Sequence, residues 1–116
     1  MIPQQISYVS IWSRELQTNR NIFANILGIP ITYEDENVVV FQTEGTQFVL
    51  QRAFGADSDL DGTVQFGLTV NDLDAVTDAL ASHKLEVTVN REDIGQNQRV
   101  TVLRLPSGQK VEFVGE

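Results

Sequence analysis

Two segments of the chain carry the same order of hydrophobic and polar positions. Apolar and polar residues alternate over residues 6–12 and again over residues 64–70, with the period of a half-buried strand. Each segment then meets an acidic residue followed by leucine, at Glu15-Leu16 and at Asp72-Leu73. The repeat predicts two copies of one structural unit.

Apolar residues at helical spacing follow each predicted strand. Gly28 and Pro30 give a strong stop to the first helix. The second helix ends at residues 82–84, where Lys84 takes the place that glycine usually has at a helix end. The helical apolar positions are Leu16, Ile22, Phe23, Ile26 and Leu27 in the first segment and Leu73, Val76, Ala79 and Leu80 in the second.

Three further strands follow each helix. The second copy is longer, and we expect its extra residues in a loop at 93–98. The pattern predicts an α+β fold of two tandem βαβββ modules in a single domain, with module boundaries at 1–53 and 63–116 and a flexible acidic linker at 54–62. The predicted strands span residues 31–33, 38–42 and 47–52 in one module and 86–89, 99–105 and 110–114 in the other.

The composition describes one ordinary globular domain. The chain has 116 residues, of which 41% are hydrophobic and 21% charged, and it contains no cysteine. The lack of cysteine excludes thiol catalysis, zinc fingers and disulfides, and it favours a cytoplasmic protein. We expect no targeting segment and no membrane span, since no apolar stretch approaches roughly 18 residues.

The balance of charges is acidic. The chain has 8 basic and 16 acidic side chains and a net charge of -8. This charge repels phosphate backbones and anionic lipid surfaces, so we expect neither nucleic acid nor membrane as a partner. The charge serves solubility and also suits a cationic small molecule, and both interpretations stay open.

Three aspartates in the linker have the spacing of a calcium loop. Asp57, Asp59 and Asp61 alternate, but the glycine and glutamate that such a loop requires do not follow in register. We therefore expect a solvated linker. The single histidine, His83, lies at the predicted helix end, where it caps the helix rather than binding a metal.

Four short motifs in this order resemble the vicinal oxygen chelate superfamily, which includes glyoxalase I, extradiol dioxygenases, fosfomycin-resistance enzymes and bleomycin-resistance proteins. The resemblance implies an open, curved barrel of mixed β-sheet with the helices outside, a ligand cavity enclosed by both modules, and a homodimer. The motifs are the strand-to-helix joints at 13–16 and 70–73, the helix stop at 26–28 and the closing segment at 105–113.

The resemblance also assigns four positions where family enzymes hold a divalent metal: Tyr8, Val49, Gln65 and Glu112. The side chain of Val49 has no lone pair to donate to a metal. Tyr8 would have to lose its proton, and its ordinary pKa is about 10. Gln65 and Glu112 alone make a weak ligand set. We therefore expect no metal cofactor, as in the metal-free bleomycin-resistance branch.

Strand parity predicts which side chains face the cavity, because residues two apart share a face. Tyr8 and Trp12 could stack on a ligand or serve as ordinary packing, and Glu112 could lie at the rim, paired with Lys110 or Arg104. The predicted cavity residues are Tyr8, Ser10, Trp12, Gln47, Val49, Gln51, Gln65, Thr69 and Glu112.

Three functions remain open at this point. The first is the binding of a small organic molecule, cationic if net charge guides it, without a complete metal site. The second is a metal-dependent lyase, isomerase or dioxygenase of the glyoxalase type. The third is a structural subunit in which the interior of the barrel is hydrophobic core and binds no ligand. An enzymatic role is the less favoured one, and the sequence does not name the ligand or choose between monomer and dimer.

Overall fold

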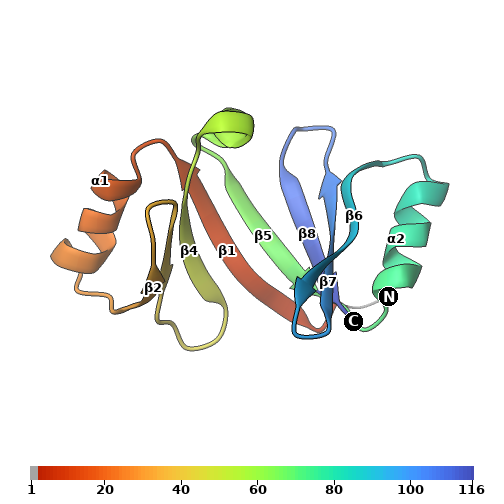
Figure 1. The fold of residues 1–116 in the computed structure, drawn as a ribbon, viewed down its shortest axis with the longest axis horizontal. Coiled ribbons are helices and arrows are strands. Elements are labelled where there is room, and N and C mark those ends of the chain that lie inside the picture. Colours follow the sequence, from red (N-terminus) through yellow and green to blue (C-terminus); the bar gives the residue numbers. More distant parts are fainter. Residues whose placement is uncertain (1–2) are drawn as a thin grey trace. The chain divides into compact units, whose positions relative to one another are not determined.

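The computed structural model describes residues 3–116. These residues form eight strands and four helical segments, which confirms the predicted α+β class. They divide into two compact units. The N-terminal unit comprises residues 8–64, and the C-terminal unit comprises residues 65–116 together with residues 3–7. Figure 1 shows α1 beside the strands of the N-terminal unit and α2 beside those of the C-terminal unit.

The N-terminal unit contains a mixed sheet in the order β2-β3-β4-β1. The first strand, β1, runs parallel to β4, whereas β3 is antiparallel to both β4 and β2. Its elements are β1 (Gln5–Ser13), α1 (Leu16–Arg20), η1 (Asn21–Ile26), β2 (Ile31–Glu34), β3 (Val38–Phe41), β4 (Gln47–Arg52) and η2 (Gly55–Leu60).

Three phenylalanines pack with buried aliphatic residues in the core between this sheet and its helix. Leu16 is buried at the start of α1 and packs with Phe41 of β3. Phe41 stacks on Phe48 of β4, with ring centroids 5.3 Å apart. Phe23 meets both rings edge-on. Such pairs stabilise beyond the apolar area they bury, so this cluster fixes the helix on the sheet.

The first helix departs from the predicted one. α1 ends at Arg20, and the chain continues as a π-helix, η1, in which the amide of Leu27 donates to the carbonyl of Ile22 at 3.0 Å. The wider turn breaks the 3.6-residue period. Ile22, Ile26 and Leu27, which the sequence pattern gives as helical apolar positions, are therefore 40%, 69% and 61% exposed. The predicted stop at Gly28 is confirmed by its φ of +73°.

The linker is more ordered than the sequence predicts. Residues 55–60 form the 3-10 helix η2, and Leu60 at its end is buried. Asp61 accepts a hydrogen bond from the backbone amide of Arg14 at 2.9 Å and lies 3.8 Å from its guanidinium. The burial of Leu60 and the contacts between Asp61 and Arg14 explain why this segment is ordered.

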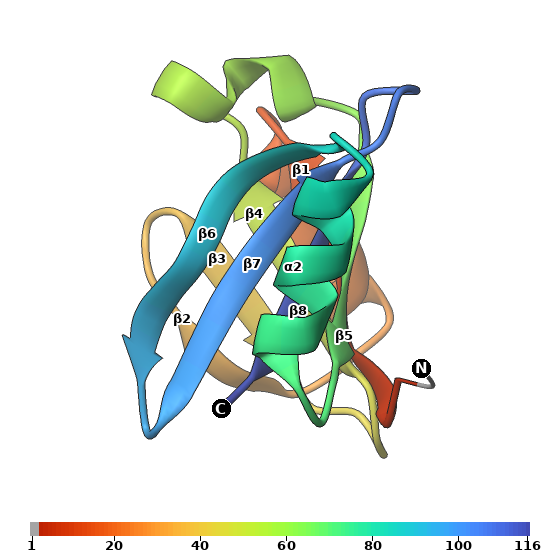
Figure 2. The same cartoon turned by 90° about the vertical axis from the view of Figure 1, so that its right-hand side faces the viewer.

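The C-terminal unit contains a second mixed sheet, in the order β5-β8-β7-β6. Strand β8 is parallel to β5 and antiparallel to β7, and β6 is antiparallel to β7. Figure 2 shows α2 lying across this sheet. Its elements are β5 (Val64–Thr69), α2 (Leu73–Ser82), β6 (Glu86–Gly95), β7 (Gln98–Arg104) and β8 (Lys110–Gly115).

Helix α2 starts and ends as the sequence predicts. The side chain of Asp72 caps its first turn by accepting from the amide of Ala75 at 3.0 Å. Leu73 and Val76 are buried on the sheet beside Phe113. Lys84 follows the helix with a φ of +56°, so it does occupy the left-handed place that glycine would fill without strain.

One buried polar contact joins α2 to the sheet. The hydroxyl of Thr77 donates to the carbonyl of Leu73 at 2.8 Å and lies 2.7 Å from the hydroxyl of Thr101 on β7. Both threonines are fully buried. This pair shows that Thr101 faces the helix.

The extra residues of the second module lie in a long hairpin, not in the loop predicted at 93–98. Strand β6 extends to Gly95, and the turn consists of Gln96 and Asn97 alone, both with positive φ. Two consecutive left-handed residues match the twist of a tight hairpin. Strand β6 also carries three register shifts against β7 and a left-handed residue, Arg91, with φ +50°.

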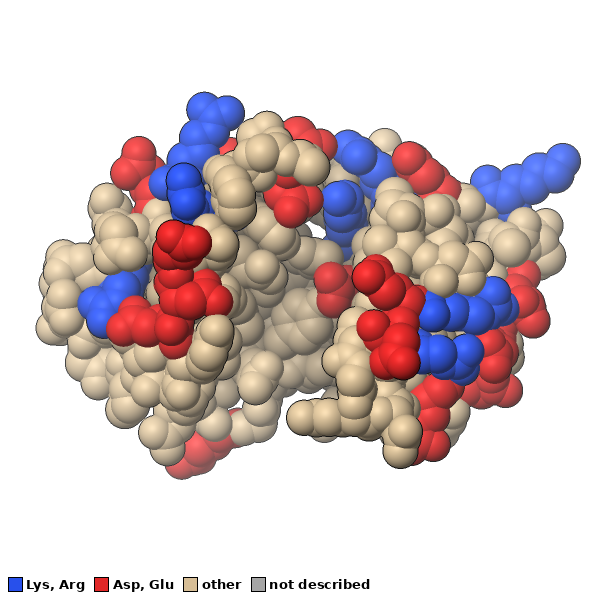
Figure 3. Space-filling view, in the orientation of Figure 1, with Lys and Arg blue, Asp and Glu red and all other residues tan. Residues whose placement is uncertain are grey.

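Charged side chains tie β6 and β7 to the outside of α2. The guanidinium of Arg91 lies 2.7 Å from Asp74 and also pairs with Asp78, while Arg99 lies 3.2 Å from Asp74. Figure 3 shows basic and acidic side chains in contact on the side of the molecule that carries α2. These contacts balance the charges of Asp74 and Asp78 locally, and the net charge of the chain stays at -8. None of the helices within residues 3–116 is long and apolar enough to span a membrane.

Candidate functional site

One face of the N-terminal sheet gathers the six predicted cavity residues of that module. Their strand register makes three neighbouring pairs across β1 and β4. Ile11, Phe48 and Leu50 pack into the helix-side cluster, so residues of the other parity lie on the opposite face. The pairs are Tyr8 with Gln47, Ser10 with Val49, and Trp12 with Gln51.

The middle of this face is closely packed. Ser10 is fully buried, and its hydroxyl accepts a hydrogen bond from the side-chain amide of Gln51 at 3.2 Å. Val49 is also buried, whereas Tyr8 and Trp12 are half-buried on either side of Ser10. Two aromatic rings thus flank a small polar centre, and their use in ligand binding stays a prediction.

On the C-terminal sheet, Gln65 and Glu112 come together. Thr101 and Phe113 face α2, so Glu112, one residue away on β8, lies on the opposite face. Glu112 pairs across the strands with Gly67 of β5. The side-chain amide of Gln65 donates to Oε1 of Glu112 at 3.2 Å, and Gln65 is only 5% exposed.

The environment of Glu112 changes its acid-base behaviour. Burial raises the pKa of this carboxyl above its ordinary value, because the charged form loses hydration. The glycine opposite it carries no side chain that could fill the space beside the carboxyl. Glu112 is thus a carboxyl that gains a proton more readily than an exposed one, and it can then donate as well as accept a hydrogen bond.

Two basic residues share the face of Glu112. Arg104 and Lys110 lie directly opposite each other on β7 and β8, two residues along from the pair Val102 and Glu112. Both basic side chains are half-buried. Along this face the basic pair comes first, followed by Glu112 with its partner Gln65. Valines of β7 and β8 lie beside and beyond them.

The four family metal positions supply few metal-binding atoms in this chain. Tyr8 and Val49 lie on one face of the β1/β4 pair, but Val49 is an apolar, buried side chain without a donor atom. Gln65 and Glu112 supply one amide and one carboxyl. Within residues 3–116, no group of three or more His, Cys, Asp or Glu side chains is placed to hold a metal ion. The donor set therefore does not fit a catalytic divalent metal, which needs about three protein ligands.

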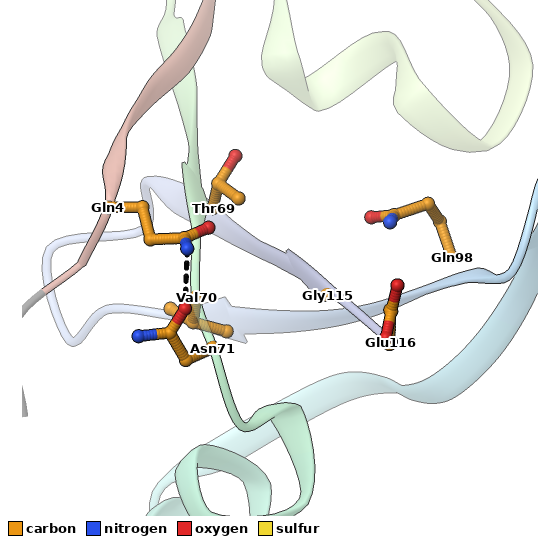
Figure 4. A pocket seen from close by; sticks show the side chains of 7 residues that line it. All are labelled: Gln4, Thr69, Val70, Asn71, Gln98, Gly115 and Glu116. Carbon is orange, nitrogen blue, oxygen red and sulfur yellow. Dashed lines mark hydrogen bonds between the residues drawn. The ribbon is translucent and has the colours of Figure 1, made fainter.

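A separate pocket lies at the end of the C-terminal sheet, where β5 and β8 finish and α2 begins. Its volume is about 260 Å³, and its lining is mainly polar. Figure 4 shows the Gln4 amide hydrogen-bonded to Asn71 on one side, with Gln98 and Glu116 on the other. Thr69 is the only predicted cavity residue in it, and the sequence pattern does not distinguish the others. The lining residues are Gln4, Thr69, Val70, Asn71, Gln98, Gly115 and Glu116.

A family model described as the Glyoxalase/Bleomycin resistance protein/Dioxygenase superfamily matches residues 5–113. No curated protein sequence matches the chain. A structure of a glyoxalase/bleomycin resistance protein/dioxygenase superfamily member from Vibrio splendidus 12B01 is similar, with 16% identity, a TM-score of 0.71, and coverage of 97% of this chain and 98% of that chain.

Structures of two named enzymes have the same fold, with similar sequence identity and TM-score. A variant of methylmalonyl-CoA epimerase from Streptomyces coelicolor has 14% identity and a TM-score of 0.74, with 99% of each chain covered. The 2,3-dioxygenase LapB from Pseudomonas sp. KL28 has 18% identity and a TM-score of 0.69, with 98% of this chain and 41% of that chain covered. Because the family model spans nearly all of the sequence, the chain belongs to the glyoxalase/bleomycin resistance protein/dioxygenase superfamily.

Proposed function

We propose that the protein binds a small organic molecule on the sheet face that carries Gln65 and Glu112, without a metal ion. The observation that carries this proposal is the 3.2 Å hydrogen bond between a buried amide and a half-buried carboxyl, set beside a glycine and valines. Ligand sites combine an apolar lining with a few fixed polar groups in this way.

The local side chains, and not the net charge, decide which ligand such a face prefers. A charge of -8 acts at long range on the approach of a cation, whereas hydrogen bonds to Gln65 and Glu112 act at the site. A compound panel should therefore contain cationic, neutral and anionic members of similar size.

Thermal unfolding tests the proposal. A ligand at about 100 times its Kd stabilises the folded state by about 2.7 kcal/mol. For a chain of this length that is a rise in Tm of roughly 10 °C. The rise should disappear in Gln65→Leu and Glu112→Leu, which keep side-chain size and remove the polar atoms, and it should persist in Glu92→Gln, an exposed position on β6. A panel in which nothing raises Tm contradicts the proposal.

The second candidate is a metal-dependent lyase, isomerase or dioxygenase. The contact between Gln65 and Glu112 favours it, because both occupy family metal positions, and similar structures include an epimerase and a dioxygenase. This candidate requires ligands beyond these two side chains. Retention of one divalent metal per chain, dependent on Glu112, would support it over metal-free binding.

We also propose that the protein is a homodimer. The proposal rests on the family resemblance. Size-exclusion chromatography with light scattering, repeated over a range of protein concentrations, should give twice the chain mass. A mass equal to one chain at all concentrations contradicts it.

A further inference from the structure

The pocket at the end of the C-terminal sheet is separate from the face that carries Gln65 and Glu112. All of its lining residues belong to the C-terminal unit, and neither Gln65 nor Glu112 is among them. Glu116 follows Glu112 by four residues, which is roughly 13 Å of extended chain. The cross-strand partners Val100 and Val114 lie between the two positions. The pocket is therefore a second place where a ligand can bind.

Main-chain contacts form the floor of this pocket. The amide of Gln4 donates to the carbonyl of Thr69 at 2.8 Å. The amide of Val70 donates to the carbonyl of Val114 at 2.9 Å. A Cβ atom on Gly115 would lie 2.8 Å from the carbonyl oxygen of Val70, so a side chain there would push these two segments apart. Three distant parts of the sequence are thus fixed around one hollow, as in a preformed ligand site.

Carboxamide groups make up much of the wall. The side-chain amide of Gln4 donates to Oδ1 of Asn71. This contact uses one donor and one acceptor, so the other polar atoms of the pair can bond a ligand. Figure 4 shows the Gln98 side chain extending across the pocket toward Gln4. Because each carboxamide presents a donor and an acceptor side by side, the lining offers both kinds of atom to one ligand.

The charges around the pocket disfavour an ionic ligand of either sign. Glu116 is the one ionisable side chain among the lining residues, and its carboxylate repels anions. The guanidinium of Arg99 donates to the main-chain carbonyl of Glu116 and lies 3.2 Å from Asp74. Helix α2 begins at Leu73, directly after the lining residues of that segment, so its positive end also lies near. These positive groups oppose a cation, whereas a neutral polar molecule meets neither penalty.

We propose that this pocket binds a polyol, a small neutral molecule with several hydroxyl groups such as a cyclitol or a monosaccharide. A hydroxyl donates and accepts through one atom, so neighbouring hydroxyls match the paired donors and acceptors of the carboxamides. The volume is about 260 Å³, which is below the roughly 300–1,000 Å³ of sites for drug-sized ligands and suits a single ring. The inference goes beyond the proposed function, because it concerns another site and another class of ligand.

NMR titration tests the pocket directly. The protein is titrated with myo-inositol and with D-glucose, and separately with methylammonium chloride and sodium propionate against sodium chloride at matched ionic strength. We expect the side-chain NH2 signals of Gln4, Asn71 and Gln98 to shift saturably with at least one polyol and with neither organic ion. The Kd should be on the order of 1 mM, because each hydrogen bond replaces one to water. Linear, unsaturated changes with both polyols, or saturation by either organic ion, would overturn the inference.

Matched variants identify the polar groups responsible. Gln98→Leu and Gln4→Leu keep the size of the side chain and remove its polar atoms, and each should raise the Kd about fivefold, the loss expected for one hydrogen bond. Gln109→Leu makes the same change at an exposed position of the same unit, outside the lining, and should leave the Kd unchanged. The spectra themselves report that each variant is folded. An unchanged Kd in both Gln98→Leu and Gln4→Leu would overturn the inference.

The two proposals can fail separately. A panel in which no compound raises Tm through Gln65 and Glu112 contradicts the proposed function, whereas saturable polyol shifts at Gln98 stand without it. A polyol whose affinity falls in Gln65→Leu but not in Gln98→Leu binds on the face of Glu112. That result would overturn the inference and support the proposed function.

Discussion

Gln65 and Glu112 are joined by a hydrogen bond of 3.2 Å between the first and last strands of the C-terminal unit. An amide suits either protonation state of its neighbour, because it can donate to a carboxylate and accept from a carboxylic acid. The pair therefore remains connected while the carboxyl titrates. Any ligand that contacts Glu112 meets a group whose charge depends on pH.

The stability of the protein should reveal the titration of Glu112. Burial raises the pKa of Glu112 in the folded state, so the folded chain holds a proton that the unfolded chain has released. Its contribution is present below the ordinary glutamate pKa of about 4.3 and is lost as the pH rises through the folded-state value. Relative to Glu112→Gln, wild type should therefore lose stability as the pH rises above the ordinary glutamate pKa.

Urea unfolding at several pH values measures this difference. Carboxyls whose pKa is lowered by arginine, such as Glu34 and Asp74, act equally in both proteins and cancel. Glu92→Gln, at an exposed position on β6, serves as the control and should follow wild type. Parallel pH curves for wild type and Glu112→Gln would show that Glu112 titrates normally.

Divalent metal should not bind stoichiometrically. Val49 contributes no donor at a family ligand position, and two oxygen ligands from Gln65 and Glu112 hold a metal poorly. Protein purified without chelator, incubated with nickel, zinc, manganese and iron(II) and then desalted, should contain well below one metal per chain by elemental analysis. One metal per chain, lost in Glu112→Leu, would reverse this assignment.

Removing one hydroxyl of the buried threonine pair should destabilise the C-terminal unit. Thr77→Val deprives the hydroxyl of Thr101 and the carbonyl of Leu73 of a partner without changing side-chain volume. We expect a loss of about 1–3 kcal/mol in the free energy of unfolding. Thr88→Val, at an exposed position on β6, should change it by less than about 0.5 kcal/mol. Equal effects of the two changes would mean that the buried contact does not contribute.

Lys84→Gly should stabilise the protein. Lys84 has a φ of +56°, a left-handed conformation that strains any residue with a Cβ atom. Glycine relieves that strain at the end of α2, and we expect a gain of about 0.5–1 kcal/mol in thermal or urea unfolding. Ser82→Gly, inside the last turn of the helix, should have the opposite sign. A loss on Lys84→Gly would show that its side chain outweighs the strain.

The repeat in the sequence predicts most of the fold because strand alternation and helix capping depend on residues that are close together in the sequence. Period-two alternation identifies β1 and β5, and capping chemistry identifies α2. The errors arise where tertiary geometry overrides the local period. The π-helix after Arg20 turns Ile22 and Ile26 outward, and a buried leucine orders the linker that its polar composition would leave loose.

For the candidate site, the alternation of side chains along a strand predicts which residues share a sheet face, but it does not predict the ligand. Parity alone puts Gln65 and Glu112 on one face, and their hydrogen bond follows from register. The pocket at the strand ends is not predictable in this way, because Gln4, Asn71 and Gln98 meet only through the packing of a turn, a helix start and a hairpin. The net charge also does not predict that Arg104 and Lys110 lie opposite each other on β7 and β8.

The irregular hairpin strand β6 has a consequence for solubility. It is the last strand in the sheet order, so one side of its backbone has no partner strand within its unit. Such an edge can recruit another chain and start aggregation. Register shifts, the left-handed Arg91 and the charges of Glu92 and Asp93 interrupt the regular row of amides and carbonyls. The features that disturb this strand thereby protect the folded protein against edge-to-edge association.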